Sequence, residues 1–480
     1  MNNTAWANKS ARETAALLDF TVDYNVHEAN LFAAIETEFG QAQSSMMYGV
    51  TRCVQHHADL IAYERQLAES LFKREDGARV IFATTTLSQG MNLPAQVAIL
   101  SADERAALGG AFVTQEPMKA HELLNAAGRA GRAGYLANGL VIMVPRTLLT
   151  FTAGVPEPAA HTALQSIIPE DERCVPMIDP LRTVLDRIQM GIPPDSDIEY
   201  LFHRLGNTDS DDSVSILLRR SFAHFMAQKA GELAQFDLAI AAFSDRLSQA
   251  DAVPEAPDWL VQLSIQSGIS PLILNRLYQS LDAQFAQLPM TVSGWVDWLI
   301  DWLLQHDDAA RFCFGSDLLP LQTIGGVPRV TPLNYQAVLT TLKNGMAPWL
   351  QGEPLARVEE AMGGTLRGQK IFCPKAREIA TNTAPRCLSY FSTFIVQIVK
   401  MIAEGKDEQL AQLAVLECLP SAIAKGADSP QKLAFMHLTR ARYRSRVEAH
   451  ADFRQRFTQL GTPEFIDYQT VMQLVGETIG

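Results

Sequence analysis

Three short apolar runs constrain the fold of this chain most. Polar loops and one segment rich in small residues separate them. The runs cover residues 79–84, 96–101 and 139–144, and their length and composition are typical of buried strands. The segment rich in small residues, 117–129, is expected to form a helix before the third strand. The order strand, loop, strand, helix, strand predicts an α/β domain, with a parallel sheet and helices on both faces.

The segment from 125 to 134 ends this predicted helix in a glycine-rich turn that carries two arginines. Arg129 and Arg132 are three residues apart, so both guanidinium groups can lie on one side of the turn. Only small residues separate them, which lets another surface approach closely. Two permanently charged, bidentate groups suit a triphosphate, as arginine fingers do in phosphoryl transfer. The alternative is a helix C-terminus stabilised by arginines and capped by glycine.

A second polar segment follows the first apolar run. Residues 83–94 contain Thr84, Thr85 and Thr86, followed by a serine and Gly90, at the carboxyl end of the predicted strand. In an open α/β sheet, ligands bind at this end of the strands. Hydroxyl groups and backbone amides there can contact a nucleic-acid backbone without reading its sequence. The alternative is an ordinary polar loop between a strand and a helix.

A third segment lies upstream of these two. It contains, in order, Gly49-Val50, Gln55-His56-His57-Ala58 and Glu64-Arg65. Taken in this order, the three segments resemble motifs of superfamily 2 helicases, and their pattern is most similar to the superkiller-like branch of the DExH-box enzymes. Residues 83–94 and 125–134 resemble motifs V and VI of that superfamily. The resemblance covers roughly the first third of the chain.

The resemblance implies a role for each matching residue. Arg129 and Arg132 would be the catalytic arginine fingers. ATP contacts are implied for Gly90, Asn92, Asn125 and Gly128. Nucleic-acid contacts are implied for His56, His57, Thr84, Thr85, Thr86 and Gln89. For the two histidines, the alternative is a solvated strand end.

Two positions depart from the family pattern. Asn125 stands where most of the family has glutamine, which keeps the amide but shortens its reach. Asp59 stands where glycine is usual, and adds a negative charge near a surface expected to face phosphates. Neither departure removes an arginine.

Two motifs that an ATP-dependent motor needs are absent from these 480 residues. The sequence contains no G-x-x-x-x-G-K-S/T loop to hold phosphates, and no D-E-x-H or D-E-x-D run to hold magnesium. The glycine-rich stretch 363–370 contains a lysine, but its spacing is wrong and we interpret it as a loop. At the N-terminus, only Asn3-Thr4 matches the end of the strand that opens the family's second RecA-like lobe. We therefore expect the chain to begin inside a domain and to lack the first RecA-like lobe.

The overall charge limits how the chain can bind a polyanion. The formal net charge is −13 and the isoelectric point is about 5.3, so binding of nucleic acid must depend on local positive patches.

An apolar fraction of 47% with 19% charged residues predicts a globular protein. The six cysteines form no C-x-x-C pair, no run is long enough to span a membrane, and no signal peptide is evident. These features favour a cytoplasmic setting, with no metal site and no membrane partner.

One positive patch is predicted near the C-terminus. A helix expected at 431–457 carries seven basic and two acidic residues, which gives a local charge of seven minus two, or +5. Arg440 and Arg444 share one face at i, i+4 spacing, and Arg442 and Arg446 share another. Arg440 and Arg444 are the predicted contacts to nucleic-acid phosphates. The alternative is a helix that pairs with acidic segments of the linker.

The pattern elsewhere predicts mainly helices. We expect one long helix at 214–249 and a helix pair at 258–266 and 272–281. An alternating pattern at 20–26 indicates a strand, with a surface loop as the alternative. Three tryptophans at helical spacing predict a buried aromatic stripe, with base stacking as the alternative: Trp295, Trp298 and Trp302.

These observations predict an α/β RecA-like second lobe at 1–150, a proline-rich linker at 151–212 and helical accessory structure at 213–480. The resemblance implies the C-terminal half of an ATP-dependent helicase or translocase. Such a protein would use ATP and Mg²⁺, act on single-stranded or partly duplex DNA or RNA, and need a first lobe in cis or in trans. The chain alone is predicted to lack ATPase activity, because nothing in it holds the β-phosphate, the magnesium or the attacking water.

A non-catalytic, helicase-derived scaffold is the alternative function. The missing phosphate-binding loop and the acidic charge favour it, and it would bind nucleic acid or a protein partner through its helical region. The genomic sequence upstream of Met1 would distinguish the two, because a motor requires an in-frame phosphate-binding loop there or in an adjacent partner gene.

Overall fold

The structure is a computed structural model, and it describes most of the helical part of the chain and shorter stretches of the rest. The described residues are 4–49, 51–84, 95–101, 104–109, 112–117, 130–131, 139–144, 151–152, 155–156, 181, 185, 214–249, 257–364, 372–440, 445–457 and 464–479. By their contacts they form two compact units, each described separately below. The first unit comprises Met1–Arg173, Pro289–Ser392 and Leu410–Gly480, and the second comprises Cys174–Leu288 and Thr393–Gln409.

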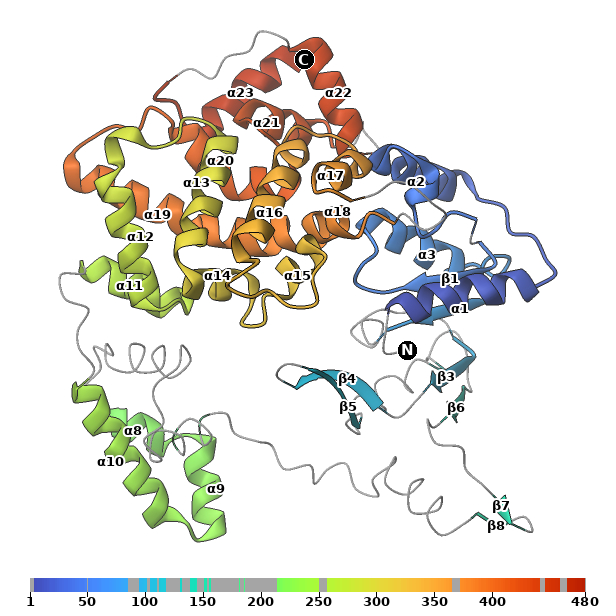
Figure 1. Ribbon diagram of the computed structural model, residues 1–480, viewed down its shortest axis with the longest axis horizontal. Coiled ribbons are helices and arrows are strands. Elements are labelled where there is room, and N and C mark those ends of the chain that lie inside the picture. The colour runs from blue at the N-terminus through green and yellow to red at the C-terminus, as the bar shows by residue number, and fades with distance from the viewer. Residues whose placement is uncertain are drawn as a thin grey trace. The chain divides into compact units, whose positions relative to one another are not determined.

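The first unit begins with a small α/β layer. Its elements are α1 (Thr4–Leu17), α2 (Val26–Phe39), the short turn η1 (Ala42–Ser44), β1 (Cys53–His56), α3 (Ala62–Lys73) and β2 (Val80–Ala83) (Figure 1). Strands β1 and β2 pair in parallel, with Cys53 opposite Val80 and His56 opposite Ala83. Helix α3 is the crossover connection that a parallel pair requires. Helix α1 packs on the pair, where Ala11 and Cys53 are both fully buried.

A capping box fixes the start of α2. The Asn25 side chain accepts a hydrogen bond from the Glu28 amide at 2.9 Å, and the Glu28 carboxylate accepts one from the Asn25 amide at 3.0 Å. Helix α2 therefore begins at Val26, and the strand indicated at 20–26 is wrong, because residues 20–25 form a loop. Helix α3 buries one face, on which Leu67 and Leu71 are fully buried, and its N-cap Ile61 is 5% exposed.

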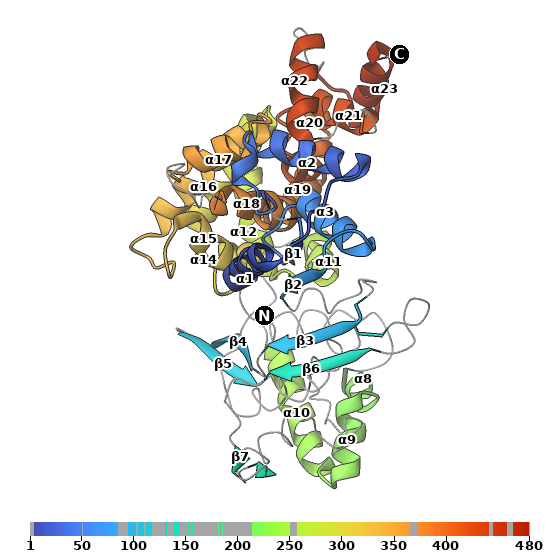
Figure 2. The same cartoon turned by 90° about the vertical axis from the view of Figure 1, so that its right-hand side faces the viewer.

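A second parallel pair follows. Strands β3 (Val97–Ser101) and β6 (Leu140–Val144) lie side by side, with Val97 opposite Leu140 and Ser101 opposite Val144 (Figure 2). The strands predicted at 79–84, 96–101 and 139–144 are thus confirmed as β2, β3 and β6. The described residues give two small parallel sheets, and a complete RecA-like sheet stays a prediction.

An antiparallel hairpin separates β3 from β6 in the chain. It consists of β4 (Glu104–Gly109) and β5 (Phe112–Pro117), and the sequence patterns did not predict it. Because β5 includes Pro117, the helix expected at 117–129 does not begin there, and the rest of that range lies outside the described residues. A shorter hairpin joins β7 (Phe151–Thr152) to β8 (Val155–Pro156). The linker predicted at 151–212 lies largely outside the described residues, and the predicted domain division remains untested.

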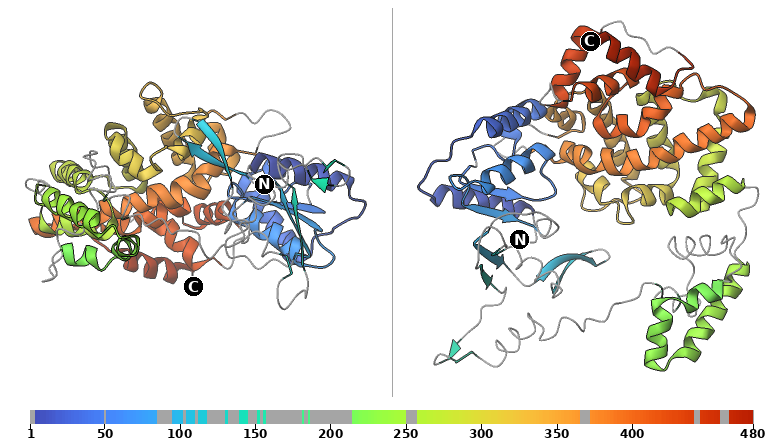
Figure 3. Two further views of the ribbon diagram at one scale, coloured as in Figure 1. Left: turned by 90° about the horizontal axis from the view of Figure 1, so that it is seen from below. Right: turned by 180° about the vertical axis from the view of Figure 1, so that it is seen from behind.

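Helices form the rest of the first unit (Figure 3). They are α13 (Val292–Gln305), α14 (Asp307–Phe314), α15 (Leu319–Gly325), α16 (Tyr335–Leu350), α17 (Leu355–Ala361), α18 (Pro374–Glu378), η5 (Ile379–Leu388), α20 (Leu413–Lys425), α21 (Pro430–Leu438), α22 (Arg446–Arg456) and α23 (Tyr468–Ile479). The aromatic stripe of α13 is buried at two of its three positions, because Trp295 is fully buried and Trp302 is 5% exposed, whereas Trp298 is half-buried. Trp298 stacks on Trp302 with ring centroids 6.4 Å apart.

A continuous helical stretch runs from Pro374 to Lys406, with α19 (Ser389–Lys406) following α18 and η5. Its middle part, η5, has the wide turns of a π-helix and contains Pro385. Among the described residues, this stretch alone is long and apolar enough to cross a membrane, so the prediction that no run has this length is wrong. Of its most apolar window, 56% is buried inside the protein. Ile379, Leu388 and Phe391 are fully buried, so core packing accounts for its composition.

The single helix expected at 431–457 is wrong. Helix α21 ends at Leu438, and α22 begins at Arg446 behind the N-cap Ser445, whose hydroxyl accepts a hydrogen bond from the Glu448 amide at 3.2 Å. The two helices pack together through the rings of Phe435, Phe453 and Phe457. The predicted spacing of the arginines therefore does not apply across the break.

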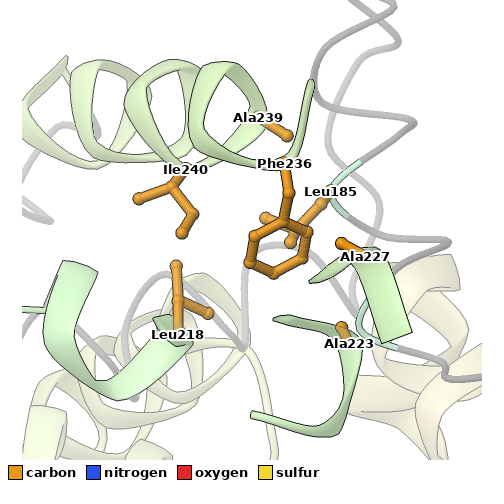
Figure 4. Packing of buried hydrophobic residues seen from close by; sticks show 7 residues of the cluster. All are labelled: Leu185, Leu218, Ala223, Ala227, Phe236, Ala239 and Ile240. Atoms are coloured by element: carbon orange, nitrogen blue, oxygen red, sulfur yellow. The ribbon is translucent and has the colours of Figure 1, made fainter. Parts of the chain in front are cut away.

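The second unit contains α8 (Val214–Arg219), α9 (Phe222–Ala230), α10 (Leu233–Gln249), α11 (Asp258–Ser267), α12 (Pro271–Ala283) and η4 (Phe285–Gln287). The single helix expected at 214–249 is wrong, because Ser221 caps α9 and Gly231, at φ +75°, ends it. The predicted pair at 258–266 and 272–281 is confirmed as α11 and α12. Figure 4 shows the core of α8 to α10, where Phe236 and Ile240 face Leu218 and Leu185.

Candidate functional site

The predicted site residues divide into those that the structure describes and those that it does not. His56, His57, Thr84 and Arg440 are described. The others lie outside the described residues: Thr85, Thr86, Gln89, Gly90, Asn92, Asn125, Gly128, Arg129, Arg132 and Arg444. Their roles therefore stay predictions.

The structure nevertheless joins the segments that carry these motifs. Ala95 directly follows the segment 83–94 and forms a parallel bridge with Ala130, inside the segment 125–134. The Gly131 amide donates a hydrogen bond to the Ala95 carbonyl at 3.1 Å. Upstream, the Thr84 amide donates to the His56 carbonyl at 3.2 Å. Each of the two later segments is thus hydrogen-bonded to another part of the motif-bearing region.

The two histidines are buried at the end of β1. His57 is fully buried, and its Nε2 lies 2.9 Å from the Oδ1 of Asn8. His56 is 4% exposed, and its Nε2 lies 3.4 Å from an oxygen of Glu69. Burial lowers the pKa of both rings, that of His57 to about 4, so His57 is neutral at neutral pH. A buried neutral ring does not attract a phosphate by charge, and the predicted nucleic-acid contact of both residues remains untested.

Glu64, in the motif Glu64-Arg65, is the centre of a buried ion pair that the sequence did not predict. Both Glu64 and Arg377 are almost completely inaccessible, at 0% and 2% exposure. The Arg377 Nη2 donates to the Glu64 Oε1 at 2.9 Å, and its Nη1 contacts the other oxygen. Glu64 also accepts hydrogen bonds from the Ser45 hydroxyl at 2.8 Å and the Met46 amide at 2.9 Å. Burial alone would raise the pKa of Glu64, but Arg377 and these donors lower it below its ordinary value.

The Arg377 guanidinium satisfies its remaining donors on backbone oxygens. It donates to the Asp59 carbonyl at 3.1 Å and to the Ser44 carbonyl at 3.1 Å, and it lies 4.5 Å from the centre of the Phe39 ring. Arg377 belongs to α18, whereas its partners belong to the N-terminal α/β layer. This pair therefore anchors the helical part of the first unit to the motif-bearing layer.

Arg446 forms a second anchor of the same kind. Its Nε lies 3.0 Å from the Glu38 Oε1 of α2, and its Nη groups donate to the Trp349 and Glu353 carbonyls, each at 2.7 Å. The guanidinium also stacks over the Trp349 ring, 4.2 Å from its centre. The predicted surface face of Arg442 and Arg446 is wrong for Arg446, which is only 9% exposed.

A cavity of about 820 Å³ opens beside this second anchor, and we call it the cationic cleft. Its walls come from α2, α3, α16, α17, η5, α20, α21, α22 and α23. Five cationic side chains line it: Arg65, Arg386, Lys425, Arg440 and Arg446. Glu38 is the one acidic side chain among the described lining residues, and Arg446 already neutralises it. In a chain of net charge −13, this is a local concentration of positive charge.

The cationic cleft contains one predicted site residue and several that the sequence did not indicate. Arg440, a predicted phosphate contact, is exposed on its rim. Arg65 lies in the motif Glu64-Arg65, which implies no role for it, and Arg386 and Lys425 lie in segments without a motif. Their only signal in the sequence is their charge, because the cleft is assembled from segments far apart in the chain.

The described residues offer no site for magnesium. Among them, no group of three histidine, cysteine or acidic side chains is arranged to hold a metal ion. The residues predicted to contact ATP lie outside the described part of the chain. No reaction step through Mg²⁺ or ATP therefore follows from the described geometry.

Curated helicases align with part of this chain. The DExH-box ATP-dependent RNA helicase DExH15 of Arabidopsis thaliana is 34% identical over 103 residues, which is 22% of this chain and 8% of that protein. The antiviral helicase SKI2 of Saccharomyces cerevisiae is 35% identical over 118 residues, or 23% of this chain and 8% of that protein. This chain carries a superkiller-like helicase segment.

A DNA helicase also aligns with part of this chain. The ATP-dependent DNA helicase Hel308 of Aeropyrum pernix is 36% identical over 93 residues, covering 19% of this chain and 12% of that protein. No protein-family model matches the chain. The helicase-like segment thus spans a small part of each of these relatives, and it confirms the family that the motifs indicated.

Proposed function

We propose that this chain supplies the second RecA-like lobe, with helical accessory structure, of a superkiller-like nucleic-acid motor. The observation that carries the proposal is the ordered set of three helicase-like segments, two of which are joined by the bridge between Ala95 and Ala130. The partial identity to DExH-box RNA and DNA helicases supports it. The lobe would occupy 1–150, and the helical part would follow a linker.

In this proposal Arg129 and Arg132 complete an ATP site that a first lobe provides. ATP with Mg²⁺ would supply the transferable phosphate and the metal that neutralises its oxygens. The two guanidinium groups would hold γ-phosphate oxygens and stabilise the negative charge of the transition state. Asn125, Gly128, Gly90 and Asn92 would contact the nucleotide from the same edge. The bridge at Ala130 supports this arrangement, because it fixes the backbone next to both arginines.

The nucleic-acid strand, DNA or RNA, would pass along the ends of β1 and β2. Thr84, Thr85, Thr86 and Gln89 would donate to backbone phosphates. Because His56 and His57 are buried, they would position the loop that follows β1, and the hydrogen bond from Thr84 to His56 supports this coupling. Arg440 and Arg444 would contribute phosphate contacts from the helical part, and Arg440 is exposed there.

A cytoplasmic setting belongs to the same proposal. The five described cysteines are free thiols: Cys53, Cys313, Cys373, Cys387 and Cys418. Burial raises the pKa of each of these thiols, so they are protonated and unreactive at neutral pH. This state is compatible with a reducing compartment.

Steady-state ATP hydrolysis with saturating single-stranded DNA or RNA tests the proposal. The 480-residue chain alone is expected to be inactive, and addition of an ATP-binding first lobe, in cis or in trans, is expected to create strand-stimulated turnover. In the complemented protein, Arg132→Ala should lower kcat by about 10³-fold or more, as loss of an arginine finger does elsewhere. Arg357→Ala is the matched control, because Arg357 lies exposed on α17, where it forms an ion pair with Glu360.

Two results would overturn the proposal. Robust turnover by the chain alone would mean that it contains a complete ATP site. Full activity of the complemented Arg132→Ala protein would remove the arginine-finger role.

A non-catalytic scaffold is the second candidate, and the cationic cleft favours it, because this site needs no ATP hydrolysis. The scaffold would bind nucleic acid or a protein partner through its helical part. A locus with no phosphate-binding loop, either in frame with this chain or in an adjacent gene, would favour the scaffold over the motor.

A further inference from the structure

The cationic cleft brings together two guanidinium groups that have no ion-pair partner among the described residues. Arg65 lies on α3 of the α/β layer, and Arg386 lies on the π-helix η5. Burial lowers the pKa of Arg65, and the positive charge of Arg386 lowers it further. The two groups are therefore close enough to repel each other across the cavity.

The nearby carboxylates are already engaged. Glu64 is bound by Arg377, and Glu38 is bound by Arg446. Glu69 lies 3.4 Å from both His56 and Lys73. Glu378 also lies near Arg386, whose positive charge lowers the pKa of that carboxyl group, although burial raises it overall. These acids oppose the repulsion only in part, because among the described residues five cationic side chains and one acidic side chain line the cleft.

An anion of defined chemistry would neutralise this charge. Two forked guanidinium groups bind the oxygens of a phosphate bidentately, and they do so better than point charges. The remaining cations, Lys425 and Arg440, are exposed at the rim, where they can hold further phosphate oxygens. The cavity of about 820 Å³ is within the range of sites for small ligands, roughly 300–1,000 Å³.

The other walls of the cleft suit an apolar ring more than a bare ion. Met436, Met472 and Leu433 line it, together with the half-buried ring of Tyr63. A ligand with an anionic end and a flat apolar end would match both parts of the lining. A nucleotide has this composition.

We propose that the cationic cleft binds a nucleotide, with Arg65 and Arg386 holding its phosphate. The nucleotide is either a free mononucleotide or the phosphorylated end of a short strand, and these share the same binding chemistry. The ligand would connect α3 of the α/β layer to η5, α20 and α21 of the helical part. Binding would therefore replace the repulsion between Arg65 and Arg386 with an attraction of each for the phosphate, and tighten the contact between these elements.

The test is isothermal titration of the 480-residue chain at low salt, in EDTA, with inorganic pyrophosphate, AMP, ATP and a 5′-phosphorylated trithymidylate as separate probes. We expect saturable binding of at least one nucleotide probe. Arg65→Gln and Arg386→Gln should each weaken it by about tenfold or more, because each removes a charge-assisted contact. Arg386→Lys, which keeps the charge but loses the fork, should weaken it less.

Three controls make the result specific. Arg357→Gln removes an exposed arginine outside the cleft and should leave the affinity unchanged. Arg132→Gln removes a proposed arginine finger and should also leave it unchanged, which separates this site from the proposed ATP site. Circular dichroism and thermal melting of each variant verify that it is folded.

The outcomes distinguish the two sources and can overturn the proposal. Tighter binding of the trithymidylate than of AMP assigns the ligand to a strand end, whereas binding of the mononucleotides alone assigns it to a free nucleotide. The proposal is wrong if no probe saturates, or if affinity survives both Arg65→Gln and Arg386→Gln. It is also wrong if Arg132→Gln alone abolishes binding, because the ligand would then occupy the other site.

Discussion

Arg377 and Arg446 are buried and each faces a carboxylate, whereas Arg65 and Arg386 line an open cavity without an ion-pair partner among the described residues. All four belong to the first compact unit, and Arg377 and Arg446 connect its α/β layer with its helices. Arginine side chains of the same compact unit thus occupy two different environments, one in which a carboxylate neutralises the charge and one in which other cations surround it.

The difference indicates which arginines stabilise the fold and which are available to a ligand. A buried ion pair is costly to break, because removing one partner leaves the other charge uncompensated in a medium of low dielectric constant. An arginine on an open cavity has no such partner to lose, and its removal also relieves repulsion. Substitution of Arg377 or Arg446 should therefore lower the free energy of unfolding, whereas substitution of Arg65 or Arg386 should change it little and weaken ligand binding instead.

The largest expected effect is that of Arg377→Gln. This change leaves the fully buried Glu64 without its cation, and should lower the free energy of unfolding by about 3–5 kcal/mol. Urea unfolding followed by circular dichroism measures it, with Arg357→Gln as the exposed control. A loss below about 1 kcal/mol would mean that the pair does not anchor the unit.

The double variant Glu64→Leu with Arg377→Met sharpens this prediction. Replacing both charges by apolar groups of similar size leaves no unpaired buried charge. The free energy of unfolding of the double variant should therefore be higher than that of Arg377→Gln alone. A double variant as unstable as the sum of the single changes would show that the two residues act independently.

Arg446→Gln should have the next largest effect, about 2–4 kcal/mol. It removes the ion pair with Glu38 and the stacking over Trp349, but Glu38 and Arg446 are each slightly exposed, so water screens part of the loss. The same unfolding measurement applies, and quenching of tryptophan fluorescence gives a second readout near Trp349. An unchanged midpoint would contradict the second anchor.

Acid should weaken the second anchor through His450, which is 1% exposed and donates from Nε2 to the Gly426 carbonyl at 2.8 Å. Burial, and then the positive charge of Arg446, lowers its pKa to about 3. Between about pH 6.5 and 3 the unfolded chain binds a proton here that the folded chain does not. The contribution of neutral His450 to the free energy of unfolding is therefore fully present above pH 6.5. It is lost as the pH falls towards 3, by up to about 1.4 kcal/mol per pH unit.

Comparison of pH slopes tests this prediction. His450→Gln should reduce the loss of stability per pH unit between pH 6 and pH 4, whatever its effect at pH 7. An identical slope in His450→Gln and the wild type would contradict the prediction.

The smallest expected change in stability is that of Arg386→Gln. Because Arg386 is exposed and has no ion-pair partner among the described residues, its loss should alter the free energy of unfolding by no more than about 0.5 kcal/mol. Any change should be an increase, since the repulsion of Arg65 is relieved. A loss of several kcal/mol in urea unfolding would place Arg386 among the anchors instead.

The sequence predicted the elements whose signals are local. The apolar runs identified β2, β3 and β6, and the pattern at 258–266 and 272–281 identified the helix pair α11 and α12. The ordered motifs identified the helicase family before any comparison. Predictions failed where a cap interrupts a favourable pattern, as Ser221 and Ser445 do in the two expected long helices.

The anchors and the cationic cleft could not be predicted in this way. Arg377 meets Glu64 across 313 positions, and Arg446 meets Glu38 across 408. No periodicity relates residues so far apart, because tertiary packing alone brings them together. A helical pattern predicts that a basic residue is exposed to solvent. It therefore predicts a surface position for Arg446, because the partner of Arg446 lies elsewhere in the chain.

One measurement tests the contrast between the two groups most directly: the gain in unfolding free energy on adding the nucleotide probe that binds, compared among wild type, Arg377→Gln and Arg386→Gln. At about 100 times Kd, bound ligand should stabilise the wild type by about 2.7 kcal/mol. Arg377→Gln should start from a much lower stability and keep this gain. Arg386→Gln should start from wild-type stability and, with about tenfold weaker binding, gain only about 1.4 kcal/mol at the same ligand concentration. If both variants lost baseline stability and ligand gain together, the separation of anchoring from ligand-binding arginines would be contradicted.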